Sequence, residues 1–321
     1  MRDWMHVLFA ALMALAMPAV AQQAWPARAI RIIVPFPAGG APDLIARPLA
    51  ARLSEQLGQP VIIDNKVGAG GRIGATELLN APPDGYTVML HGSPLTIDPS
   101  VHLAAKWDVA KDFEGIGRIG EIPNAIVVAG NSRFKTLAEF LSAARAEPGV
   151  YNFSSIGNTT VTHLAIDMLQ QASKVKLTPV FYPGNPAAQL ALLRGDIQLM
   201  STSVALVNRT GQANTPRPLA VTSVRRSRMF PDVPTVAELG YPGYEATTWY
   251  ALFAPRRTPP DVVARLGKEL AAAVQNPQVQ KSLVDLGMDI EVLSGPPFKA
   301  FLEQEQRRWA EVLQAAGIKP Q

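Results

Sequence analysis

The chain has 321 residues, of which 48% are hydrophobic and 17% charged, the composition of a folded protein with enough apolar residues for two cores. Its formal net charge is +4, but the basic residues are scattered and not interleaved with aromatic ones, which argues against a nucleic-acid partner. The chain contains no cysteine, so it forms no disulfide and carries no lipoprotein anchor.

The first 21 residues have the pattern of an export signal. Arg2 precedes an uncharged apolar core, Pro18 interrupts the run, and Ala19-Val20-Ala21 supplies the small residues of a cleavage site. A retained membrane anchor is the alternative, but it needs about 20 apolar residues, and this core is shorter. We therefore expect cleavage after Ala21 and a periplasmic protein that does not insert into the membrane after processing.

The rest of the chain begins with a strand, a glycine loop and a helix. The β-branched run at 30–34 predicts a strand, Gly39 and Gly40 predict a turn, and the apolar spacing of 43–57 predicts a helix that Gly58 ends. A helix that starts after a strand directs unpaired N–H groups at whatever lies there, and an anion is the simplest guest. A tight turn without a ligand is the alternative.

This pattern recurs and predicts parallel strands joined by helical crossovers. A strand at 61–64 precedes a second glycine loop at 68–74, and a strand at 87–90 precedes a third loop that contains Ser93. The second loop lacks the Lys-Ser/Thr ending of a Walker motif. We therefore expect it to be structural or a wall of the site, and not a nucleotide site.

In the second half, a strand at 151–153 leads into a hydroxyl-rich loop at 154–160 and an amphipathic helix. Tyr182 lies in a later loop, and a strand at 197–200 ends in a loop that contains Thr202. Extended segments near 120–124 and 250–255 are the expected crossings between domains. We predict an α/β fold with two lobes, each a mostly parallel sheet flanked by helices: 22–122 with 252–321, and 123–251.

Five separated blocks, in order, resemble the Bug family, the extracytoplasmic solute receptors of tripartite tricarboxylate transporters. The likeness extends from about Trp25 to the C-terminus. Its blocks are Arg31–Gly40 with Asp43, Gly68–Gly71 with Gly74, Pro83–Tyr86, Gly157–Thr160 with His163 and Leu164, and Asp232–Glu238 followed by Trp249–Pro255.

The resemblance implies a periplasmic binding protein of type II-like fold that closes over a small organic acid or amino acid and delivers it to membrane transporter subunits. It implies a monomer without catalysis, cofactor or metal. It also implies that the loops at 36–43 and 154–160 hold the ligand from opposite lobes, partly through water. The chain departs from the family pattern at Thr159, Pro183 and Ser201–Ser203, so the ligand's identity does not carry over from a relative.

Asp43 is the candidate with two open roles. It is either the first-turn acid of its helix or a contact for an ammonium, hydroxyl or water, because a carboxylate repels a bound carboxylate. The hydroxyls at 154–160 exceed what helix capping needs, so we expect at least two to contact ligand. The candidate ligand-binding residues are Phe36, Ala38, Gly39, Gly40, Ala41, Asp43 and Ser93 in the first lobe, and Ser154, Ser155, Asn158, Thr159, Thr160, Tyr182 and Thr202 in the second.

Two rival functions remain at this point, a receptor that presents its ligand to a signalling sensor and an exported enzyme that acts on a small organic acid. His163 and Asp167 have the i, i+4 spacing of a helical metal pair or an acid–base pair. The chain has few other histidines and no Gly-x-Ser-x-Gly elbow. We therefore expect no catalytic residues and no metal ligands.

Overall fold

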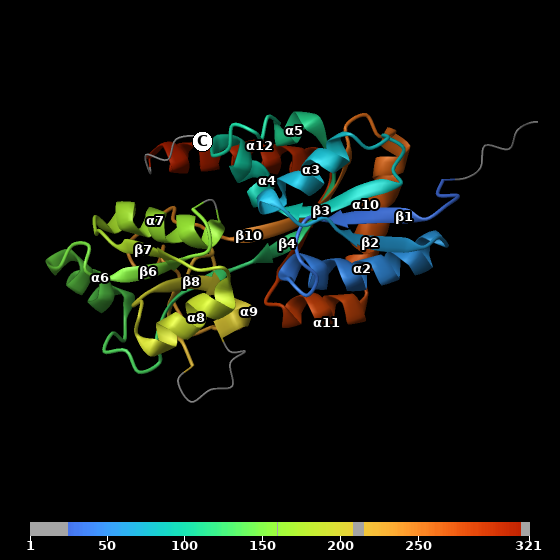
Figure 1. Ribbon diagram of the computed structural model, residues 1–321. Coiled ribbons are helices and arrows are strands. Elements are labelled where there is room, and N and C mark those ends of the chain that lie inside the picture. The colour runs from blue at the N-terminus through green and yellow to red at the C-terminus, as the bar shows by residue number, and fades with distance from the viewer. Residues whose placement is uncertain (1–24, 159, 208–214, 316–321) are drawn as a thin grey trace, which may run out of the picture.

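The computed structural model describes residues 25–158, 160–207 and 215–315. The predicted export signal and the candidate residue Thr159 lie outside these ranges. Figure 1 shows two lobes side by side, with strands passing between them. Within the described ranges, no helix combines the length and the apolar character needed to cross a membrane.

The first lobe is built on a six-stranded sheet in the order β11-β4-β10-β3-β1-β2. β1 pairs parallel with β2 and β3, whereas the β10–β3, β10–β4 and β11–β4 pairs are antiparallel. The strands are β1 (Ile30–Val34), β2 (Val61–Asn65), β3 (Thr87–Gly92), β4 (Phe113–Ile122), β10 (Thr248–Pro255) and β11 (Asp289–Leu293).

Helices cover both faces of this sheet (Figure 1). One face packs on α2 (Ala41–Leu57), α10 (Pro260–Gln275) and α11 (Pro277–Asp285), and the other on α3 (Arg72–Leu79), α5 (Val109–Asp112) and α12 (Gly295–Ala315). The predicted helix after the glycine loop is confirmed, because α2 buries Ile45, Leu49, Leu53 and Leu57 and ends at Gly58, which has φ 66°. Shorter helices are η1 (Ala69–Gly71), α4 (Pro94–Ile97) and η2 (Asp98–Ser100).

The second lobe has a three-stranded sheet, β8-β5-β9, and a two-stranded sheet, β6-β7. An isolated parallel bridge between Phe153 and Leu199 joins them. The strands are β5 (Asn124–Val128), β6 (Asn152–Ser155), β7 (Thr178–Phe181), β8 (Met200–Ser203) and β9 (Arg217–Val221). The helices are α6 (Leu137–Ala146), α7 (Val161–Ser173), α8 (Asn185–Arg194) and α9 (Val204–Val207).

The two lobes are joined by extended chain. β4 ends at Ile122 in the first sheet, and β5 begins at Asn124 in the second. β10 returns beside β4, with Thr248 opposite Ile122 and Pro255 opposite Phe113. The exact limits of the lobes stay a prediction.

Two expectations about the strands need correction. The sheets are mixed and not mostly parallel, because β10 pairs antiparallel with β3 and β4, β11 pairs antiparallel with β4, and β5 pairs antiparallel with β8 and β9. β8 covers Met200–Ser203, so Thr202 lies in a strand opposite Ala125 and not in a loop after it. Polar side chains misled the prediction here, since the backbone pairing with β5 decides the strand.

Asp98 is a buried carboxyl beneath the third loop. Asp98 is only 2% exposed, and its Oδ2 has no hydrogen-bond partner within the described chain. Burial raises the pKa of Asp98 to about 7, although the guanidinium of Arg72, 3.8 Å from Oδ1, lowers it in part. The folded protein therefore holds a proton on this carboxyl through the acidic range.

The substitution Asp98→Asn should stabilise the protein at pH about 8 by roughly 2 kcal/mol and change little at pH about 4. The sign follows from the raised pKa: the folded state binds one proton more than the unfolded state between the two pKa values, so wild-type stability falls as pH rises through that window. Urea unfolding of both proteins across this range measures the effect. An equal decline in both proteins would contradict the burial argument.

Candidate functional site

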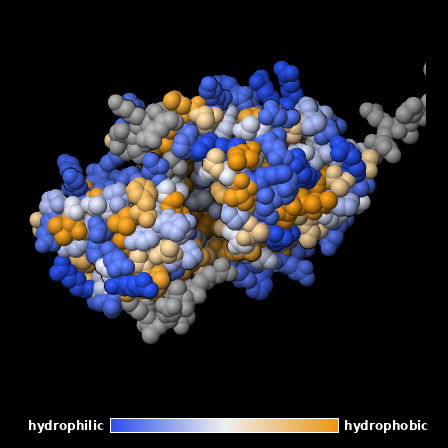
Figure 2. Space-filling view, viewed as in Figure 1, coloured by the Kyte–Doolittle hydropathy of each residue, from blue (hydrophilic) through white to orange (hydrophobic). Residues whose placement is uncertain are grey.

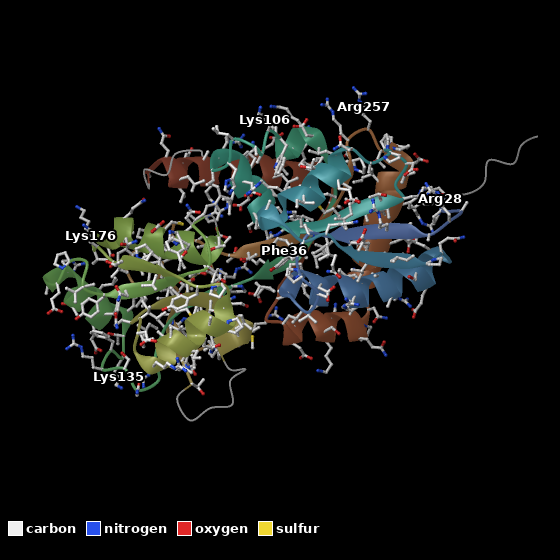
Figure 3. All side chains as sticks on the ribbon, viewed as in Figure 1. Arg28, Phe36, Lys106, Lys135, Lys176 and Arg257 are labelled. Atoms are coloured by element: carbon white, nitrogen blue, oxygen red, sulfur yellow. The ribbon has the colours of Figure 1, made fainter. Side chains whose placement is uncertain are left out.

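The candidate site lies where the two lobes face each other. Figure 2 shows a hollow between the lobes, and in Figure 3 Phe36 lies at the end of the first lobe that faces the second. The carboxyl ends of β1 and β3 bring the loops at 35–40 and 93 to the first lobe's side of this hollow. In open α/β sheets, ligands bind outside the carboxyl ends of parallel strands.

The first glycine loop turns at Gly39, which has φ 80°, a value that favours glycine. The Gly40 N–H donates to the Pro37 carbonyl at 3.2 Å, and Gly40 is the N-cap of α2 without a side-chain cap. Ala38 and Gly39 are exposed, and Gly40 and Ala41 are half-buried. The loop therefore offers main-chain groups and the unpaired start of a 17-residue helix to the hollow.

Asp43 holds this loop in place. Asp43 is only 1% exposed. Its carboxylate accepts hydrogen bonds from Gly39 N at 2.9 Å and Asn65 Nδ2 at 3.1 Å. It also accepts from Nε and Nη2 of Arg47, at 2.7 and 2.9 Å. Asn65 Nδ2 also donates to the Phe36 carbonyl at 3.0 Å. Burial alone would raise the pKa of Asp43, but the bonds from Arg47, Gly39 and Asn65 hold it below its ordinary value.

Asp43 thus has the structural role that the sequence left open, because its oxygens are occupied within the protein. A direct contact between Asp43 and ligand stays a prediction. Sequence reasoning gave no role to Arg47 or Asn65. The i, i+4 spacing of Asp43 and Arg47 was a readable signal, whereas Asn65 reaches Asp43 only through the pairing of β1 with β2.

The third loop is tied to β10. Ser93 is fully buried, and its Oγ lies 3.3 Å from the Thr247 carbonyl and accepts from Trp249 N at 3.1 Å. The neighbouring His91 accepts from Gly92 N through Nδ1 at 2.8 Å, and its Nε2 has no partner within the described chain. Burial lowers the pKa of His91 to about 4, so it is neutral at physiological pH. The expected contact of Ser93 with ligand stays a prediction.

On the second lobe, Thr160 is the N-cap of α7. Its Oγ1 accepts from His163 N at 3.3 Å and donates to the Gly157 carbonyl at 2.8 Å. Ser155 Oγ accepts from Gly157 N at 3.1 Å and lies 2.8 Å from His163 Nδ1. Hydroxyls therefore hold both the N–H and the C=O of Gly157.

The other predicted residues of this lobe differ in exposure. Ser154 is 5% exposed and its hydroxyl has no hydrogen bond to a described residue, whereas Asn158 is exposed. Tyr182 is half-buried and anchored by its N–H, which donates to the Ser155 carbonyl at 2.8 Å. Thr202 is buried on β8 and its Oγ1 is unpaired within the described residues. Their contacts with ligand are likewise not yet tested.

The site contains donors and acceptors but no assembled metal centre. Among the described residues, no group of three or more His, Asp or Glu side chains is placed to hold a metal ion. The guanidinium at the first loop, that of Arg47, is engaged with Asp43. The buried candidate side chains without a hydrogen bond to a described residue are the hydroxyls of Ser154 and Thr202, and a hydroxyl can donate to an anion.

Comparison with known proteins places this geometry in a family. The sequence matches the family model described as the tripartite tricarboxylate transporter family receptor, TctC, over residues 45–318. The periplasmic binding protein BugD is similar in structure, with a TM-score of 0.79, 32% identity, and coverage of 92% of this chain and 100% of BugD.

Two further similar structures were determined with a small organic acid. Rpa4515 of R. palustris with adipate has a TM-score of 0.82 and 32% identity over 92% of this chain and 100% of its own. MatC (Rpa3494) from Rhodopseudomonas palustris with bound malate has a TM-score of 0.73 and 30% identity over 90% of this chain and 100% of its own. The predicted fold and the predicted likeness to the Bug family are confirmed. This chain belongs to the TctC family of periplasmic solute-binding proteins.

Proposed function

We propose that this protein is a periplasmic receptor that captures a small carboxylate-containing metabolite, with a dicarboxylic acid as the first candidate, and delivers it to a tripartite tricarboxylate-type transporter. The observation that carries the proposal is a pair of segments on facing lobes that lead into the starts of α2 and α7: Phe36–Asp43, and the described residues of 154–160. Adipate and malate in the two similar structures are both dicarboxylic acids, which supports the same class here.

The proposed contacts suffice for useful affinity. Hydrogen bonds to a charged group contribute about 1.5–3 kcal/mol each. Four or five of them contribute about 6–15 kcal/mol, and after an association cost of at least about 4 kcal/mol the upper part of this range brings micromolar binding within reach. Such a ligand needs no arginine in the site, so the engagement of Arg47 with Asp43 does not weaken the proposal.

The proposal favours a binding role over catalysis. The similar proteins named above are binding proteins, and Ser155 and His163 are engaged in shaping the loop. A signalling receptor would use the same ligand site, so the two uses differ in the membrane partner and not in these residues.

A thermal-shift panel tests the ligand class. We expect four- to six-carbon dicarboxylates such as malate and adipate to raise the melting temperature by several degrees. A ligand at a hundred times its Kd stabilises the folded state by about 2.7 kcal/mol. If neither mono-, di- nor tricarboxylates stabilise the protein, the proposed ligand class is wrong.

Thr160→Ala should weaken acid binding tenfold or more by calorimetry, and the effect should grow when Thr159→Ala is added. Loss of the cap should also cost about 1 kcal/mol of stability. Thr136→Ala is the matched control, since Thr136 caps α6 of the same lobe through its bond from Glu139 N at 3.1 Å. It should lower stability equally and leave affinity unchanged; equal affinity in both variants would remove Thr160 from the site.

Asp43→Asn should lower stability by about 1–3 kcal/mol and weaken ligand binding, because an amide cannot accept all four of the donors that surround Asp43. Denaturant unfolding and calorimetry measure the two effects. Asp285→Asn is the control, an exposed i, i+4 partner of Lys281 at 2.7 Å, and it should change neither by much. An unchanged affinity for Asp43→Asn would show that the loop does not depend on this carboxylate.

A further inference from the structure

His163 is at the centre of the hydrogen bonds that shape the second-lobe loop. Its Nδ1 lies 2.8 Å from Ser155 Oγ, and its main-chain N–H donates to Thr160 Oγ1 at 3.3 Å. Both hydroxyls bind Gly157, Ser155 at the N–H and Thr160 at the C=O. A closed ring therefore runs from the imidazole through Ser155, Gly157 and Thr160 and returns to the main chain of His163.

The far side of the imidazole is fixed as well. His163 Nε2 lies 3.1 Å from Asp167 Oδ2, and Asp167 Oδ1 accepts from Gln170 Nε2 at 3.0 Å. Gln170 Oε1 in turn accepts from Leu177 N at 2.7 Å. This chain of side chains extends along α7 from the loop to the segment before β7, and it holds the imidazole in one orientation.

The positions of the protons follow from this geometry. An ionised carboxylate only accepts, so Nε2 carries the hydrogen that Asp167 receives. In a neutral imidazole Nδ1 is then the acceptor, and the hydroxyl of Ser155 must donate to it. Because Gly157 N also donates to Ser155 Oγ, the hydroxyl has no hydrogen left for a ligand. In this state Ser155 cannot donate to a carboxylate.

Protonation of His163 reverses this hydrogen bond. Nδ1 then carries a hydrogen and donates to Ser155 Oγ, and the hydroxyl hydrogen of Ser155 is released. Ser155 is only 1% exposed, so a released hydroxyl hydrogen at this place needs a new acceptor. An acceptor brought by the ligand is the simplest partner.

On the basis of the proposed function, we propose that His163 is a positioning residue that couples capture of a carboxylate to uptake of one proton. The proton passes from solvent to Nδ1 of His163, and the hydroxyl of Ser155 turns from the imidazole to the ligand. Asp167 stabilises the resulting imidazolium. The loop then binds an ionised acid more tightly than a neutral analogue of the same shape.

The surroundings of His163 are consistent with one charged partner. β6 contributes Phe153 and β7 contributes Phe181, with ring centroids 5.4 and 6.2 Å from that of His163, and neither side chain titrates. Asp167, on the same helix, is the ion-pair partner of His163 among the described residues. A proton taken up at this place is therefore balanced by Asp167.

Calorimetry in buffers of different ionisation enthalpy tests the coupling, with malate, succinate and adipate as probes at pH about 7.5, where their carboxyl groups are ionised. The wild-type protein should take up a proton, up to about one per ligand bound. If no acid binds, the proposed function is wrong. If an acid binds without proton uptake, the proposed function stands and this inference is overturned.

Variants assign the proton to His163. In His163→Asn the amide N–H replaces Nδ1–H as a permanent donor to Ser155, so binding should stay within a few fold of wild type without proton uptake. His163→Leu should lose affinity tenfold or more. His102→Asn is the matched control, another i, i+4 neighbour of an aspartate, with Nε2 3.9 Å from Asp98 Oδ1, and it should keep wild-type uptake. Full uptake in His163→Asn would overturn the inference.

Should His163→Asn not fold, Asp167→Asn tests the same step. The amide carbonyl still accepts from Nε2, but the charge that stabilises the imidazolium is gone, so fewer protons should be taken up per ligand bound. Wild-type proton uptake with wild-type affinity would show that Asp167 and His163 serve the fold alone.

Discussion

The arrangement of this receptor depends on the antiparallel pair formed by β4 and β10. The two strands stay paired from Thr248 opposite Ile122 to Pro255 opposite Phe113, and both belong to the first sheet. The chain leaves β4 for the second lobe after one residue, Pro123. Because this pair fixes where the second lobe begins, it also fixes which loops of the two lobes meet. The place of the candidate site is thus set by backbone pairing before any of its side chains is considered.

The two loops reach a fixed shape by opposite electrostatic means. In the first lobe an ionised carboxylate, that of Asp43, receives hydrogen bonds from Gly39, Asn65 and Arg47. In the second lobe neutral hydroxyls and the imidazole of His163 hold Gly157. Loops that are shaped in advance lose little conformational entropy on binding.

The sequence predicts well what depends on local spacing. Apolar residues four apart and the glycine at 58 were enough to predict α2 and its end. The threonine at 160 was enough to predict a possible N-cap for α7. It predicts poorly what depends on pairing between distant strands. The predicted strand at 197–200 lies earlier in the chain than β8, because the polar residues of β8 do not resemble a strand. The relative direction of β4 and β10 has no local signal in the sequence. The hydrogen bond between Ser155 and His163 could be predicted only in part. The sequence marks each residue as polar and close to the start of α7, but only the packing of α7 on β6 brings the two side chains together.

The C-terminal helix limits how the lobes can move against each other. Glu305 on α12 accepts from Trp249 Nε1 at 2.9 Å and from Trp309 Nε1 at 3.1 Å, so the helix is bound to β10. Trp309 and Leu313 of the same helix are buried in the cluster that forms the core of the second lobe. A helix anchored in both lobes resists displacement of one lobe relative to the other. The relative position of the two candidate loops therefore depends on α12 as well as on the β4–β10 pair.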